Sequence, residues 1–176
     1  MKTIVTFVVL ALAFLGGGPA RAAEEPQLVQ VVDFSKLLPL LPNPPADWTA
    51  DKAEGSTEDI GGNKITSVHR DYKKGDGDTA PTTSISILDS AANPDYVSST
   101  TAAWSMSTTT PEGYTKTLTI EDMPGFETFE NEGKHGTLWL MVAKRYVLTI
   151  ETQNQESKEL QEWLKRIDVK KLAEVK

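Results

Sequence analysis

Four short segments with the residue pattern of β-strands follow one another closely in the second half of the chain, and they constrain its fold more than any other feature. They are residues 114–120, 126–130, 137–143 and 145–152. Alternation at every second residue is typical of β-strands. Strands joined by links this short pair antiparallel, because a parallel crossover needs a dozen residues or more. The sequence therefore predicts a four-stranded antiparallel meander.

The third of these strands is expected at the centre of the sheet, because both of its rows of side chains are apolar. The rows are Leu138, Leu140 and Val142 on one side and Trp139, Met141 and Ala143 on the other. A strand that is buried on both faces has such a near-continuous apolar run. We therefore expect helices or loops on both faces of the sheet at this point.

The C-terminal segment has the period of an amphipathic helix. Its apolar residues recur at i, i+3, i+4 and i+7, namely Leu160, Trp163, Leu164 and Ile167. This spacing places them on one helical face, which we expect to lie on the sheet. Asp168 is the predicted N-cap of a last short turn.

In the first half of the chain, the residue pattern predicts a β-hairpin between two helices. Residues 33–38 fit a short helix with Asp33 as its N-cap. Residues 65–72 and 82–89 alternate as two strands, with turn residues between them. Asn93-Pro94 marks the start of the second helix, because proline is favoured at the first helical position.

The stretch from Gly55 to Asn63 is interpreted as a turn region, and Met123-Pro124-Gly125 as a connection between two strands of the meander. The whole order is then short helix, strand, hairpin, helix, four-strand meander and helix. Runs of antiparallel strands with helices packed on the faces define an α+β fold. We expect an antiparallel sheet of about six to seven strands.

The first 22 residues have the features of a secretory signal peptide. Lys2 precedes an apolar run over residues 4–15, a Gly/Pro break follows, and Ala20-Arg21-Ala22 fits an A-x-A cleavage site. A transmembrane helix needs about 20 apolar residues, so this run is too short to be a membrane anchor. We therefore predict cleavage near Ala22, a flexible leader over residues 23–32 and a single α+β domain over residues 33–176. The expected location is the periplasm or the medium, with no transmembrane anchor in the mature form.

Composition excludes several classes of function. The chain has no cysteine, so disulfides, thiol catalysis, thiolate zinc sites and lipoprotein anchoring are excluded. Its formal charge is −7, and removing Lys2 and Arg21 with the signal makes it more negative. Nucleic acids and anionic membranes are therefore disfavoured as partners.

The order of elements, together with two short segments, resembles the PsbP-like α/β/α sandwich, a fold of small secreted bacterial proteins of unknown function. The first segment is the Pro-Pro-x-x-Trp entry of Pro44, Pro45 and Trp48, and the second is the closing segment of residues 162–168. The resemblance spans most of residues 34–174. It implies an accessory, assembly or binding role, and it supplies no catalytic set.

No catalytic, cofactor or metal site is predicted. The two histidines, His69 and His135, lack metal-site spacing, and no serine stands in a G-x-S-x-G elbow. Asp76-Gly77-Asp78 resembles the start of a calcium loop, but the position that would need an acidic ligand is Ile87. We therefore expect no cofactor and no enzymatic activity.

The candidate ligand or partner surface consists of Glu127, Glu130, Glu132, Trp48 and Trp104. The glutamates form the densest acidic stretch, which would attract a cationic peptide or divalent cations. Alternatively, they mark a solvated strand edge that resists edge pairing. The tryptophans either pack in the core or line a cleft for an apolar or sugar ligand.

Three functions stay open at this point. The leading hypothesis is an exported, non-enzymatic binding or accessory protein that acts on another envelope protein or a small ligand. The first alternative is a carrier of lipids or small hydrophobic molecules in the cell envelope. The second is a weak binder of divalent cations.

Overall fold

The computed structural model describes residues 30–60, 63–90 and 94–176. The predicted signal peptide and most of the predicted leader lie outside the described residues. The helices are α1 Phe34–Leu37, η1 Leu38–Leu40, α2 Pro94–Ala102, η2 Ala103–Ser105, η3 Glu132–Lys134, α3 Lys158–Leu164 and α4 Val169–Glu174. The strands are β1 Thr49–Ala50, β2 Glu54–Ile60, β3 Asn63–Lys73, β4 Thr82–Asp89, β5 Thr108–Thr110, β6 Gly113–Ile120, β7 Met123–Glu130, β8 His135–Val142 and β9 Tyr146–Gln153.

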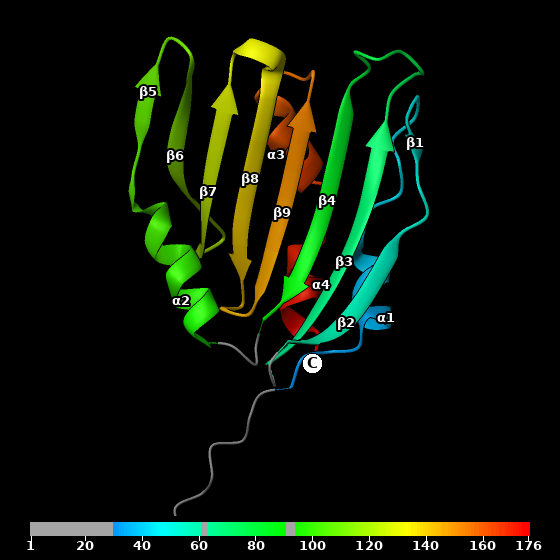
Figure 1. Ribbon diagram of the computed structural model, residues 1–176, viewed down its shortest axis with the longest axis vertical. Helices are drawn as coiled ribbons and strands as arrows, with labels where there is room; N and C mark the ends of the chain where they lie inside the picture. Colours follow the sequence, from blue (N-terminus) through cyan, green and yellow to red (C-terminus); the bar gives the residue numbers. More distant parts are fainter. Residues whose placement is uncertain (1–29, 61–62, 91–93) are drawn as a thin grey trace, which may run out of the picture.

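These strands form one antiparallel sheet in the order β1-β3-β4-β9-β8-β7-β6-β5, and β2 pairs with the other half of β3 (Figure 1). The α+β class and the antiparallel meander are confirmed. The predicted count of six to seven strands is too low, because the described residues contain nine. None of the described helices is long and apolar enough to cross a membrane.

The three strands that the sequence did not indicate are β1, β2 and β5, and all lie at the sheet edges. β2 occupies most of the stretch interpreted as a turn region, and its sequence Glu-Gly-Ser-Thr-Glu-Asp-Ile contains a single apolar residue. An edge strand that buries almost nothing shows no apolar alternation, so pattern alone does not reveal it. Gly55 within β2 permits close packing, because a Cβ there would lie 3.0 Å from the ring of Phe34.

The connection between β6 and β7 also differs from the prediction. Met123, Pro124 and Gly125 belong to β7, and the turn is formed by Glu121 and Asp122. Both turn residues have positive φ, 49° and 65°, which is the geometry of a two-residue type I′ hairpin. Pro124 is tolerated because it stands near the start of its strand.

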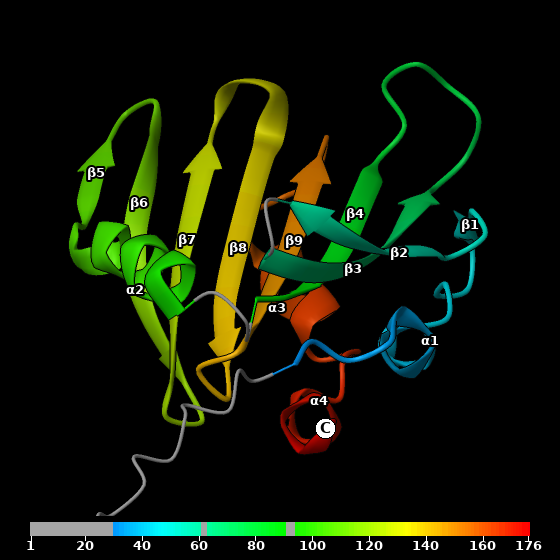
Figure 2. The ribbon, with the colours of Figure 1, turned by 60° about the horizontal axis from the view of Figure 1, so that its bottom comes forward.

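The sheet has two unequal faces (Figure 2). α1, α3 and α4 pack on one, which we call the helix-covered face. α2 and η2 cover part of the other, which we call the open face. The prediction of helices on both faces is confirmed.

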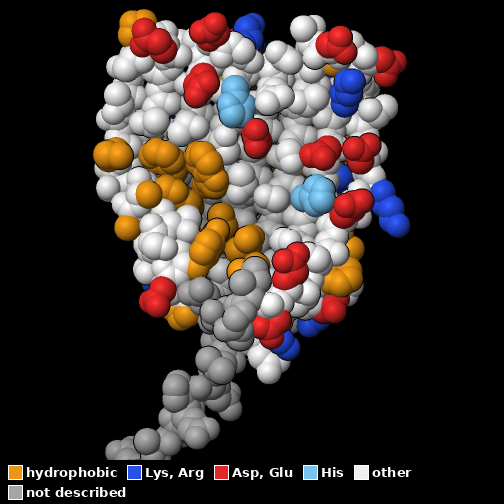
Figure 3. Space-filling model, in the orientation of Figure 1, with side chains coloured by type: hydrophobic (Ala, Val, Ile, Leu, Met, Phe, Trp, Pro, Cys, Tyr) orange, Lys and Arg blue, Asp and Glu red, His pale blue; other side chains and the backbone are white. Residues whose placement is uncertain are grey.

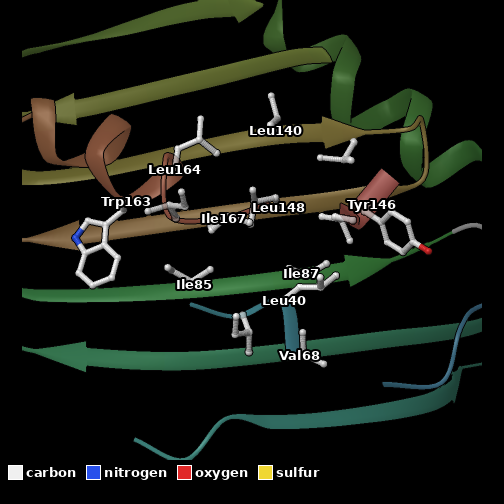
Figure 4. Packing of buried hydrophobic residues seen from close by; sticks show 14 of the residues in the cluster. Leu40, Val68, Ile85, Ile87, Leu140, Tyr146, Leu148, Trp163, Leu164 and Ile167 are labelled. Atoms are coloured by element: carbon white, nitrogen blue, oxygen red, sulfur yellow. The ribbon is translucent and has the colours of Figure 1, made fainter. Parts of the chain in front are cut away.

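The main core lies between the sheet and the helices of the helix-covered face (Figure 4). Sheet residues such as Ile85, Leu140 and Leu148 share one buried cluster with Trp163 and Leu164 of the predicted C-terminal helix. The smaller cluster lies on the open face, where Trp104 of η2 packs with Met141 and Val147. Strand β8, predicted to be central, contributes to both.

A buried ion pair ties the start of the described chain to the sheet. Asp89 is fully buried, and Arg145 donates to it from Nε at 2.9 Å and from Nη2 at 2.8 Å. The same carboxylate accepts from the backbone N–H of Val32 at 2.7 Å, and Arg145 also donates to the carbonyl of Gln30. Both oxygens of the Asp89 carboxylate thus accept hydrogen bonds, which offsets the cost of burying its charge.

Asp89→Ala removes this carboxylate and leaves Arg145 without its counter-ion. We expect the free energy of unfolding to fall by about 3 kcal/mol, measured by urea denaturation. The matched control is Glu156→Ala, which breaks the exposed pair with Lys134 and should leave the midpoint nearly unchanged. Equal shifts in both variants would contradict a special role of the buried pair.

The buried phenol of Tyr72 should make the folded protein less stable at alkaline pH. Burial raises its pKa to about 12, above the value of about 10 for an exposed phenol. The folded protein keeps this proton where the unfolded chain releases it. The stabilisation is therefore complete below about pH 10 and is lost as the pH rises through the folded pKa. Tyr72→Phe should flatten this fall in urea titrations; an identical slope in both proteins would disprove the assignment.

Candidate functional site

The predicted acidic surface is not one surface. Alternation along β7 sends Glu127 to the helix-covered face and Glu130 to the open face. Glu132 lies exposed in η3. The interpretation of these residues as a solvated strand edge is also wrong for β7, which lies between β6 and β8.

Glu127 is an internal anchor for α3. Its side chain is 1% exposed, and its carboxylate accepts from Tyr114 Oη at 2.5 Å and from Gln161 Nε2 of α3 at 2.7 Å. Lys116 Nζ lies 2.8 Å away and supplies the counter-charge. Burial and the bond to Glu127 raise the pKa of Tyr114, so the phenol stays protonated and keeps donating.

Glu127→Gln tests this structural role, because the amide keeps the shape and removes the charge. Tyr114 and Gln161 donate to the carboxylate and Lys116 balances it, so we expect a loss of about 2 kcal/mol in the free energy of unfolding. Glu130→Gln on the same strand is the matched control and should change nothing. Equal stability of the two variants, measured by thermal and urea denaturation, would show that Glu127 does not anchor α3.

The two predicted tryptophans lie on opposite faces of the sheet. Trp48 packs edge-on against Trp163 with ring centroids 5.0 Å apart on the helix-covered face. Trp104 lies in η2 on the open face and packs with the smaller cluster. The two therefore line no common cleft. Val97 of α2 also packs on this cluster, whereas Tyr96 beside it is exposed.

The open face is organised in rows that run across the strands, because cross-strand partners stand side by side. Next to α2 lies an apolar row, which contains Leu88, Val147 and Met141 and is covered by η2. Beyond it follows what we call the aromatic row, Ser86, Thr149, Trp139, Phe126 and Thr117. Trp139 and Phe126 are half-buried, and their centroids are 6.0 Å apart.

The next row contains no apolar side chain, and we call it the polar row. Its members are successive cross-strand partners from β3 to β5: Asp71, Ser84, Glu151, Thr137, Thr128, Thr115 and Thr108. Within the described residues, the hydroxyls of Ser84, Thr137, Thr128 and Thr115 have no hydrogen-bond partner. Thr137 at the middle of the row is buried, and the other members are partly or fully exposed. The row thus presents free donors and acceptors to solvent on either side of β8.

Polar groups continue to the strand ends farthest from α2. This outer row contains Lys73, Thr82, Gln153, His135 and Glu130. His135 Nε2 lies 2.9 Å from Glu151 Oε1 and links the outer row to the polar row. Figure 3 shows the change along the face, from hydrophobic side chains near α2 to a mostly uncharged polar surface above, with scattered acidic side chains.

Two hollows lie along the polar and outer rows. The first has a volume of about 410 Å³ and is lined by Asp71, Ser84 and Glu151 of the polar row, together with parts of β1. The second has a volume of about 460 Å³ and is lined by Thr108, Thr115 and Thr128 of the same row. Between them stand His135 and Thr137 of β8. The open face therefore has a polar track with a hollow at each end.

The histidines and acidic side chains of the described residues do not converge as metal ligands. His69 and His135 both face the open side, but β4 and β9 separate their strands. Among the described residues, no group of three or more histidine and acidic side chains is placed to hold a metal ion. The chemistry that the face offers is hydrogen bonding and aromatic contact.

Sequence reasoning missed the polar track because the residues of the polar row lie on seven strands. The signal was present in part, since the alternation of 82–89, 114–120 and 145–152 already placed serines and threonines opposite the core. What was missing was the register between strands, which places these residues in one row.

Comparisons with protein-family models, with curated proteins and with solved structures find no match to the chain.

Proposed function

We propose that the protein is an exported, non-enzymatic binding protein that holds its ligand or partner on the open face of the sheet. One observation carries the proposal: beyond α2, the open face carries one row of unpartnered hydroxyl groups next to two half-buried aromatic rings. The opposite face is closed by α1, α3 and α4. Polar rows of this kind add nothing to core packing, so a role in binding accounts for them better than a role in folding.

The proposed PsbP-like relationship fits this function. An antiparallel sheet with helices on both faces is compatible with that family, and the family implies binding or accessory roles. The relationship remains a proposal that rests on the element order, the entry of Pro44 and Pro45 to Trp48, and the closing segment.

The two alternatives have less support. A carrier of hydrophobic molecules needs a deep apolar cavity, whereas the space between the sheet and its covering helices is filled by side chains such as Leu37, Leu138 and Leu172, all with no exposed surface. A divalent-cation binder would need converging acidic side chains, and Glu127 points away from Glu130.

Export predicts a processed N-terminus. We expect that the full chain, expressed in a bacterium with a general secretory pathway, is recovered outside the cytoplasm and begins at Ala23. N-terminal sequencing and intact mass measure this directly. Ala22→Phe should block processing, because the cleavage site needs a small residue. Full-length protein retained in the cytoplasm would contradict the proposal.

The binding role is tested by histidine footprinting. His69 and His135 both lie on the open face, so their carbethoxylation rates report whether this face is covered. We expect an envelope fraction to slow modification of His135. The controls are two exposed lysines, Lys165 directly after α3 and Lys171 in α4, which should be modified at unchanged rates. Unchanged rates at both histidines would overturn the proposed function.

A catalytic role is tested separately. We expect no turnover of ester, glycoside or phosphate substrates by the purified protein. Turnover that is lost in His69→Ala would show an enzyme instead.

A further inference from the structure

We propose that the open face binds an uncharged, extended oligosaccharide of hexose units, laid across the strands from β3 to β5. This inference rests on the proposed function, since it names the ligand class for the same face.

The first argument is the shape of the track. The two hollows lie at opposite ends of the polar row, and β8 lies between them. A ligand that fills both must be long and must cross the strands. A small compact molecule would use one hollow and leave the other empty.

The second argument is the spacing of the row. Neighbouring strands lie about 4.8 Å apart, so the accessible residues Thr128, Thr115 and Thr108 offer one hydroxyl at each step across β7, β6 and β5. That step is close to the length that one hexose ring adds to an extended chain. Successive sugar rings would therefore meet successive strands in equivalent positions.

The third argument is the chemistry of the lining. Serine and threonine hydroxyls both donate and accept, which matches sugar hydroxyls that do the same. The carboxylates of Asp71 and Glu151 strengthen such bonds as charged acceptors. Phe126 and Trp139 border the polar row, and their apolar ring surfaces suit the C–H groups of a sugar ring.

The fourth argument is charge. Along the polar and outer rows, Asp71, Glu130 and Glu151 outnumber the one described cation, Lys73. Polymers of uronic acids or sulfated sugars are therefore repelled. An extended basic peptide would tolerate the charge, but peptides usually join a sheet by main-chain bonds at its edge, and the track crosses the middle of the sheet.

Isothermal titration of the purified protein with cellohexaose, chitohexaose and maltohexaose tests the proposal. We expect at least one neutral hexaose to bind with a Kd below about 1 mM and to bind more tightly than its disaccharide. Hexagalacturonate, which has the same length and is anionic, should not bind.

The test variant and its control both change a threonine of β6. Thr115→Val combined with Thr128→Val removes two hydroxyls of the polar row and keeps their shape, and it should raise Kd about tenfold, the effect of losing roughly 1.4 kcal/mol of binding free energy. Thr119→Val removes a hydroxyl of the same face of β6 but outside the track, and it should leave Kd unchanged.

The remaining outcomes overturn the proposal in distinguishable ways. If no neutral hexaose binds but an envelope fraction still protects His135, or a Lys/Arg-rich peptide binds instead, the ligand class is wrong and the binding function stands. If hexagalacturonate binds as well as the neutral chains, or Thr119→Val weakens binding as much as the double variant, the track is not the site. If neither sugar nor envelope fraction protects His135, both proposals fail.

Discussion

The alternation of side chains along eight-residue strands that pair in register is the constraint on which the rest of this structure depends. β4 pairs with β9 over its full length, and β9 pairs with β8 over seven residues. Because successive side chains point to opposite faces, burying Ile85 and Ile87 under the helices sends Ser84 and Ser86 to the other side. The core therefore dictates which residues the open face can present.

The two buried carboxylates show how the helices and the N-terminal segment are held to this sheet. Asp89 joins Arg145 and the backbone of Val32, and Glu127 joins Lys116, Tyr114 and Gln161. Each lies on the helix-covered face and is bonded to several groups of the described chain. Because these hydrogen bonds and ion pairs occupy both carboxylates, neither is available to a ligand. The sequence alone had predicted that Glu127 belongs to an acidic surface.

Much of the architecture was predictable from the sequence, and the failures have physical causes. The alternation of β4, β6, β8 and β9, the C-terminal helix, the caps Asp33 and Asp168 and Pro94 at the start of α2 were all predicted, and the structure confirms them. β1, β2 and β5 were not, because edge strands bury too little to show a pattern. The candidate residues Glu127 and Trp48 were chosen by type, and both are engaged in packing inside the fold.

By itself the sequence determined the class of fold, the central position of β8, the absence of thiol chemistry and the features that predict export. These follow from periodicity and composition, which act locally along the chain. The tertiary structure alone decided that serines and threonines from distant segments stand in one row, with a hollow at each end and two aromatic rings beside it. Register between strands is a non-local property, set when the core closes on the opposite face, and for that reason no single segment of the sequence reveals it.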